Sequence, residues 1–98
     1  MNMKDIRTDG TDRLFKAMMA LESVVEFYDF FEDLCTVKEL RDMTQRFEVA
    51  ALLDRGMSYQ KVSELTNVSS ATISRVKRCL DYGSGGYANA LGKLKEVE

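Results

Sequence analysis

The sequence predicts an all-α protein of about six helices with a helix-turn-helix at its centre. Apolar residues recur at helical spacing, and no stretch shows the strict alternation expected of a half-buried strand. Residues 58–78 contain two short amphipathic segments separated by a turn of three or four residues, the spacing of a helix-turn-helix. With 98 residues, the chain is short enough to form one small domain.

Local signals explain how the helix-turn-helix begins, turns and packs. Ser58 and Ser69 stand where N-caps are expected. Asn67 lies at the turn, where a left-handed backbone is usually needed and asparagine tolerates that conformation best after glycine. The apolar positions of this segment are expected to face the core, and they are Val62, Leu65, Val68, Ile73, Val76 and Leu80.

The outward face of the second helix predicts insertion into a DNA major groove. Its N-terminal end is small and polar, where base edges would lie, and its C-terminal end is basic, where phosphates would lie. The residues expected to read bases are Ser70, Ala71 and Ser74, and those expected to hold phosphate are Lys77 and Arg78. The residues expected to touch the DNA backbone from the preceding helix are Tyr59, Gln60 and Ser63. The alternative is an ordinary helical hairpin within a bundle.

The N-terminal third of the chain predicts an arm and two helices. Residues 1–10 are polar, and we expect them to form a mobile arm ahead of a single domain over 11–98. Within 11–35 we expect two dimerisation helices. The first is capped by Thr11, and the second opens with a capping box that begins at Ser23.

The rest of the chain predicts a central helix, the helix-turn-helix and a C-terminal helix. The central helix, over 36–55, opens with a capping box at Thr36 and ends at Gly56, which takes the C-cap role. The helix-turn-helix spans 58–81. A glycine-rich segment then leads to a last helix over 87–96.

The distribution of charge matters more than the net charge of −2. Residues 1–54 carry a net charge of −5, whereas residues 55–98 carry +3. A basic face on an acidic body suits a selective duplex binder with weak non-specific affinity. It does not suit a protein that coats DNA.

Several classes of function are disfavoured. The chain has no histidine, so it has no obvious catalytic imidazole and no histidine-based metal site. Cys35 and Cys79 lack the spacing of a metal site, and we expect reduced thiols in a cytoplasmic protein. No apolar run approaches the roughly 20 residues that span a bilayer. We therefore expect no catalytic residue, metal, cofactor or membrane partner.

The helices expected over 11–35 are too apolar for a lone chain of this size to bury comfortably. The residues on which this expected interface is argued are Phe27, Phe30 and Phe31. We expect a homodimer, which would also place two recognition helices about 34 Å apart to read a palindrome. The alternative is a monomer with an efficiently packed core.

Several runs of the sequence resemble the Trp repressor superfamily: LCTVKELR from Leu34, LLDRGMSY from Leu52 and ATISR from Ala71. The resemblance is strongest to the YerC/YecD-like branch, in which ATISRVxRCLxYGxGGY is a shared signature, and it covers residues 11–96. It implies an intertwined, all-helical homodimer in which the N-terminal helices of one subunit wrap the other. It also implies a bacterial transcriptional regulator, in the first instance a repressor, that binds double-stranded DNA.

The resemblance further implies a ligand pocket beside the recognition helix. The residues matched to this pocket are Thr36, Arg46, Thr72, Arg75, Val76 and Cys79. Val76 stands where the family has a glycine that leaves room for an indole, and overpacking of this kind commonly costs about 1–3 kcal/mol, which disfavours tryptophan. Cys79 replaces a serine and is expected to be a small hydrophobe rather than a sensor. Another small corepressor, no ligand, and purely structural arginines all stay open.

A second class of function also stays open. The helix-turn-helix fold could serve as a protein-interaction module that has lost its affinity for DNA. Ser70, Ala71 and Ser74 are chemically quiet, and three nearby cations attract phosphate only modestly. Salt separates the two hypotheses, because only a duplex binder loses affinity steeply as salt rises.

Overall fold

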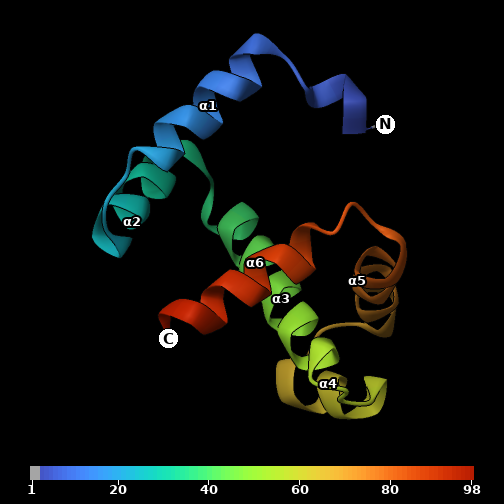
Figure 1. Cartoon of the computed structure of the whole chain (residues 1–98). Coiled ribbons are helices and arrows are strands. Elements are labelled where there is room, and N and C mark those ends of the chain that lie inside the picture. Colours follow the sequence, from blue (N-terminus) through green and yellow to red (C-terminus); the bar gives the residue numbers. More distant parts are fainter. Residues whose placement is uncertain (1–2) are drawn as a thin grey trace. The chain divides into compact units, whose positions relative to one another are not determined.

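The structure, a computed structural model, describes residues 3–98, and this part of the chain is all helical, without strands (Figure 1). Its elements are η1 (Met3–Ile6), α1 (Asp9–Met19), α2 (Val24–Leu34), α3 (Val37–Asp54), α4 (Tyr59–Thr66), α5 (Ser70–Tyr82) and α6 (Gly86–Val97). The all-α prediction, with six α-helices, is therefore confirmed. The chain divides into two compact units, one ending at Val37 and the other running from Lys38 to Glu98. The single domain expected over 11–98 stays a prediction.

The buried core lies in the second unit and draws on each of its four helices and on the turn between α4 and α5. Its buried side chains are Val49, Ala50, Leu53, Val62, Val68, Ile73, Val76 and Leu91. Leu65 was expected to join them, and this prediction is wrong, because Leu65 is 57% exposed. The inward stripe of α4 runs through Val62 and Thr66 at i and i+4, which leaves Leu65 on the outer edge.

The helix-turn-helix has the caps and the turn that the sequence predicts. Ser58 Oγ accepts a hydrogen bond from Lys61 N at 3.2 Å, and Ser69 Oγ accepts one from Thr72 N at 3.3 Å. Asn67 ends α4 in the left-handed region, with φ 55° and ψ 22°. One left-handed residue therefore reverses the chain between the two helices.

α3 ends as predicted at a glycine with a positive φ. Gly56 has a φ of 85°, and its N–H donates to Leu53 O at 2.9 Å. The next N–H, of Met57, reaches back to Leu52 O at 3.2 Å. These two bonds make a Schellman motif, which satisfies carbonyls at the end of α3 and directs the chain into α4.

α1 begins earlier than the sequence analysis predicts. The cap is Thr8, not Thr11, because Thr8 Oγ1 accepts a hydrogen bond from Thr11 N at 3.1 Å. With this start, two aspartates fall in the first turn, where the positive end of the helix dipole favours them. The mobile arm predicted over residues 1–10 is therefore too long: Met3–Ile6 forms a 3-10 helix and α1 begins at Asp9, while residues 1–2 lie outside the described residues.

α2 begins at the predicted capping box, with one difference in its bonds. Ser23 Oγ accepts from Glu26 N at 3.2 Å, as expected. The Glu26 carboxylate, however, accepts from Glu22 N at 2.6 Å, one residue before the cap. Phe31 stacks on Phe27 and meets Phe30 edge-on, with ring centroids 6.3 and 5.7 Å apart. Even so, no side chain of α1 or α2 is buried.

The turn predicts a specific response to substitution at Asn67. Asn67→Ala should lower the free energy of unfolding by about 1 kcal/mol, because alanine adopts the left-handed conformation at a cost, whereas Asn67→Gly should change it by less than about half of that. Urea denaturation followed by circular dichroism measures both. Asn89→Ala, in the exposed interior of α6, is the control and should not destabilise. Equal losses from both Asn67 variants would contradict the left-handed turn.

Candidate nucleic-acid interface

α5 buries one face and presents the opposite face to solvent. Ile73 and Val76 are 0% and 1% exposed, whereas Ser70, Ala71 and Ser74 are all exposed. Since the exposed three occupy the first half of α5, the small polar surface predicted to meet base edges is accessible. The structure brings these three residues together as predicted.

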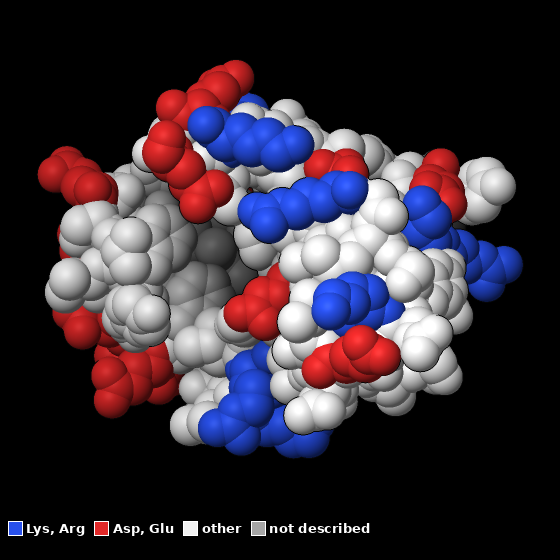
Figure 2. Space-filling model, turned by 90° about the horizontal axis from the view of Figure 1, so that it is seen from below, with Lys and Arg blue, Asp and Glu red and all other residues white. Residues whose placement is uncertain are grey.

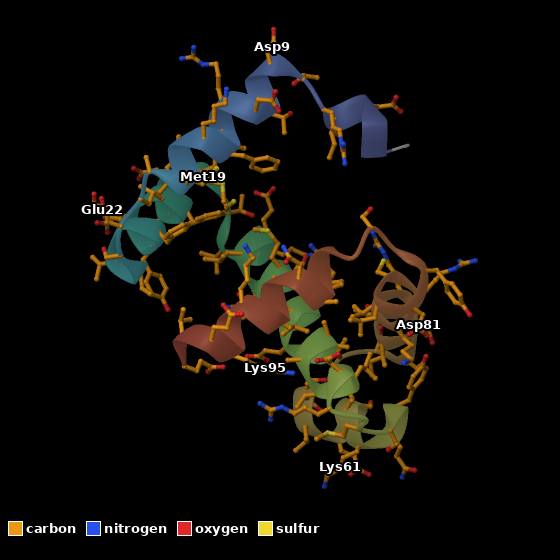
Figure 3. All side chains as sticks on the ribbon, viewed as in Figure 1. Asp9, Met19, Glu22, Lys61, Asp81 and Lys95 are labelled. Atoms are coloured by element: carbon orange, nitrogen blue, oxygen red, sulfur yellow. The ribbon has the colours of Figure 1, made fainter. Side chains whose placement is uncertain are left out.

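The basic end of α5 contains an acid that the sequence analysis missed. Arg78 is exposed, but Lys77 Nζ lies 3.3 Å from Asp81 Oδ1, with side chains 39% and 42% exposed. Figure 3 labels Asp81 near the C-terminal end of α5. The signal was in the sequence, because residues four apart on a helix are neighbours. Lys77 is therefore partly engaged within its own helix.

Other lysines of the second unit are paired in the same way. The ion pairs among the described residues are Lys38 with Asp42 at 2.8 Å, Lys77 with Asp81 at 3.3 Å and Lys95 with Asp54 at 3.5 Å. On the face drawn in Figure 2, Lys and Arg side chains are interspersed with Asp and Glu rather than gathered in one patch. Two of the cations in residues 55–98, Lys77 and Lys95, are thus locally compensated.

The α4 residues predicted to touch the DNA backbone differ in availability. Tyr59 is exposed, and Gln60 is exposed with its Nε2 donating weakly to Glu64 Oε1 at 3.4 Å. Ser63 is half-buried, and its hydroxyl donates to Val68 O across the turn at 3.4 Å. Ser63 therefore has a structural bond that a DNA contact would have to share or replace.

A threonine that the sequence analysis did not single out also fixes the turn. Thr66 Oγ1 donates to Val62 O at 2.7 Å and accepts from Val68 N at 3.2 Å. The hydroxyl thus connects the last turn of α4 to Val68, in the turn before α5. These bonds hold the two helices at one angle, which keeps the outer face of α5 in a fixed position.

A polar cleft separates α3 from the turn and the start of α5. Its volume is about 370 Å³, and its lining residues are Lys38, Asp42, Gln45, Arg46, Asn67, Val68, Ser69 and Thr72. The hydrogen bond from Lys38, with the charges of Lys38 and nearby arginines, lowers the pKa of Asp42 below its usual 3.8. The cleft therefore presents an ionised carboxylate, paired with Lys38, together with the guanidinium of Arg46.

Only part of the predicted effector pocket lines this cleft. Arg46 and Thr72 do, and both are half-buried. Arg75 and Cys79 are exposed on α5, Val76 is buried in the core, and Thr36 belongs to the other unit. The polar members Lys38 and Asp42 were missed, although their i, i+4 spacing made a paired lysine and aspartate predictable.

The two cysteines are free thiols in different surroundings. Cys35 is half-buried after α2, whereas Cys79 is exposed near the end of α5. The expectation that Cys79 is a small buried hydrophobe is wrong, because Ile73, Val76 and Leu80 take the inward stripe of α5 and leave Cys79 outside it.

Within residues 3–98, no group of three or more Cys, Asp or Glu side chains is arranged to hold a metal ion. In the same part of the chain, no helix combines the length and apolar character needed to cross a membrane.

The comparisons with known proteins agree with this architecture. The model of the Trp repressor protein family matches residues 9–95. The YerC protein of Bacillus subtilis (strain 168), described as uncharacterized, is 45% identical over 98 residues, which cover 100% of this chain and 94% of YerC. A TrpR-like protein of Eubacterium eligens ATCC 27750 has a solved structure with a TM-score of 0.89 at 42% identity, covering 97% of this chain and 98% of that one. A solved structure from Staphylococcus aureus gives 0.91 at 39% identity, covering 97% and 95%.

The fold and the site define a helix-turn-helix protein of the regulator type rather than an enzyme type. The chain belongs to the Trp repressor family, and the resemblance read from its sequence is confirmed.

Proposed function

We propose that this protein is a sequence-specific DNA-binding transcriptional regulator, in the first instance a repressor, that acts as a homodimer in the bacterial cytoplasm. The observation that carries the proposal is the exposed outer face of α5, with Ser70, Ala71 and Ser74 backed by a fully buried inner face. Membership of the Trp repressor family supports the same function.

Each part of the surface has a distinct role in this proposal. Ser70, Ala71 and Ser74 meet base edges, directly or through water, because short side chains let the helix approach the groove floor. Lys77 and Arg78 bind phosphates on one flank of α5. On α4, Tyr59 and Gln60 bind the backbone on the other flank, with Ser63 in a secondary role.

The homodimer is proposed from the first unit. α1 and α2 have 11 residues each, and helices of that length are marginal in water unless tertiary contacts stabilise them. None of their side chains is buried, and their exposed apolar residues are Phe15, Met19, Val24, Val25, Phe27, Tyr28 and Leu34. A second copy of the chain would cover such a surface, and it would supply the second recognition helix.

The polar cleft is where we propose that any effector binds. Asp42 and Arg46 offer opposite charges to a small polar molecule, with the hydroxyls of Ser69 and Thr72 beside them. An indole is disfavoured, because Val76 fills its position in the packed core. The proposal therefore keeps a small polar corepressor, or none, and disfavours tryptophan.

A protein-interaction module is the rival function. The pairing of Lys77 with Asp81 favours it, since this lysine is not free to attract phosphate at full strength. The two functions differ in their response to salt, because only binding to a duplex loses affinity steeply as the salt concentration rises.

Duplex affinity should fall steeply with salt if α5 binds DNA. For a dimer that contacts four to six phosphates, the slope of log K against log salt should be roughly −4 to −5. A duplex selected from random sequences is compared with a scrambled one by fluorescence anisotropy. Arg78→Ala should weaken both duplexes by about three- to tenfold, because it removes a phosphate contact. Ser74→Ala should weaken only the selected duplex, by roughly fivefold. A flat salt response would support the interaction module instead.

The protein should sediment as a dimer, and its melting temperature should rise with protein concentration. Val24→Glu should shift it toward monomer, because this 71% exposed side chain belongs to the apolar surface of α2. Glutamate in the first turn of a helix is compatible with the helix dipole, so α2 itself is not penalised. Glu32→Gln, on the same helix, is the control and should leave the dimer intact. A monomeric wild-type chain would contradict the proposal.

Tryptophan should not raise the melting temperature, because Val76 occupies the space that an indole needs. A ligand at about ten times its Kd adds about 1.4 kcal/mol of stability, a shift of several degrees for a domain of this size. A thermal-shift screen of amino acids and other small polar metabolites therefore detects an effector. Arg46→Ala should abolish the shift caused by any compound that binds the cleft. A shift with tryptophan itself would overturn this part of the proposal.

A further inference from the structure

α5, all of whose residues the structure describes, carries one acid among its basic residues. Asp81 follows Arg75, Lys77 and Arg78 and lies in the last turn of the helix. A negative charge there opposes the helix dipole, which favours cations near the C-terminus. Through the helix dipole, Asp81 therefore does not stabilise α5.

Asp81 forms an ion pair with Lys77, one of the cations of the candidate interface. Lys77 Nζ and Asp81 Oδ1 are 3.3 Å apart, and both side chains remain accessible, at 39% and 42%. Asp81 is also three residues after Arg78, a spacing that puts the two residues on the same side of the helix, while its ion pair is with Lys77. The one acid of α5, labelled in Figure 3, thus pairs with a cation that would bind phosphate.

We propose that Asp81 is an affinity-limiting residue that competes with DNA phosphates for Lys77 and lowers the sequence-independent part of duplex binding. The inference rests on the proposed DNA-binding function. To contact DNA, Lys77 exchanges the Asp81 carboxylate for a phosphate, and Asp81 itself is brought toward a polyanion. Both effects reduce the electrostatic term, while the base-reading surface of Ser70, Ala71 and Ser74 is untouched.

This arrangement gives the protein a low non-specific affinity for DNA. The electrostatic term supplies essentially all of non-specific binding, so an acid beside the phosphate-binding cations limits how much protein is held at the wrong sites. The other lysine pairs, Lys38 with Asp42 within α3 and Lys95 of α6 with Asp54 of α3, contain no residue of α5.

The test is Asp81→Asn, measured by fluorescence anisotropy on the selected and the scrambled duplex over a series of salt concentrations. The variant should bind both duplexes about three- to tenfold more tightly as a dimer, by a similar factor. Its slope of log K against log salt should become steeper by about 1 to 2, because Lys77 of each protomer then takes part fully. The ratio of the two affinities should change little.

Two further variants separate Lys77 from a general effect of charge. Asp54→Asn removes one acid of similar exposure, 38%, that pairs with Lys95 on another helix, and it should leave the affinity and the slope unchanged. In a Lys77→Ala background, Asp81→Asn should lose most of its effect on the slope, since the competing lysine is gone. A purely structural role of Asp81 would alter the melting temperature and leave the slope as it is.

The outcomes distinguish the inference from the function on which it rests. If the wild-type protein binds duplexes with a steep salt response and Asp81→Asn behaves like wild type, the role of Asp81 is overturned and the proposed function stands. An equal gain in affinity from Asp81→Asn and Asp54→Asn would also overturn it, because net charge alone would then explain the gain. If neither the wild type nor the variant binds duplexes, the proposed function and the inference fail together.

Discussion

The burial of one face of α5 is the constraint on which the rest of the structure depends. Ile73 and Val76 enter a core that also holds Val49 from α3 and Val62 from α4. Because residues three and four apart share a face of a helix, fixing these two side chains inside fixes which residues point out. The outward position of Ala71 and Ser74 is therefore a consequence of core packing, and the chemistry of the site follows from it.

The sequence was most informative where structure is set by neighbours along the chain. Ser58, Ser69, Asn67 and Gly56 all take their predicted roles, because caps and left-handed turns depend on two to four adjacent residues. Periodicity failed at Leu65, since an eight-residue helix has room for only one narrow inward stripe. Two suitable caps close together, as in α1, cannot be ranked without weighing where the aspartates fall. The dimer and the base-reading residues stay predictions.

Charge shows a different limit. Counting residues along the chain gave a basic second half, yet the structure pairs two of its lysines, Lys77 and Lys95, with acids one turn or one helix away. An exposed ion pair of this kind contributes little to the free energy of unfolding, but it weakens the attraction between its lysine and a polyanion such as DNA. The difference between a basic segment and a basic surface therefore lies in side-chain pairing, which composition alone does not reveal.

The same core that presents α5 also bears on regulation. Val76 is buried in the core and takes up room that a glycine at this position would leave for an indole. The polar cleft, about one turn away along α5, keeps charged side chains open to solvent. A ligand that binds there would act on Asn67, Ser69 and Thr72, the residues that set the start of α5. Since the angle of α5 depends on this turn, an effector in the cleft would shift the proposed DNA-binding face of α5 by changing the turn between α4 and α5. Control of this kind would need no space in the core, so the proposed effector site and the buried valine at position 76 are physically compatible.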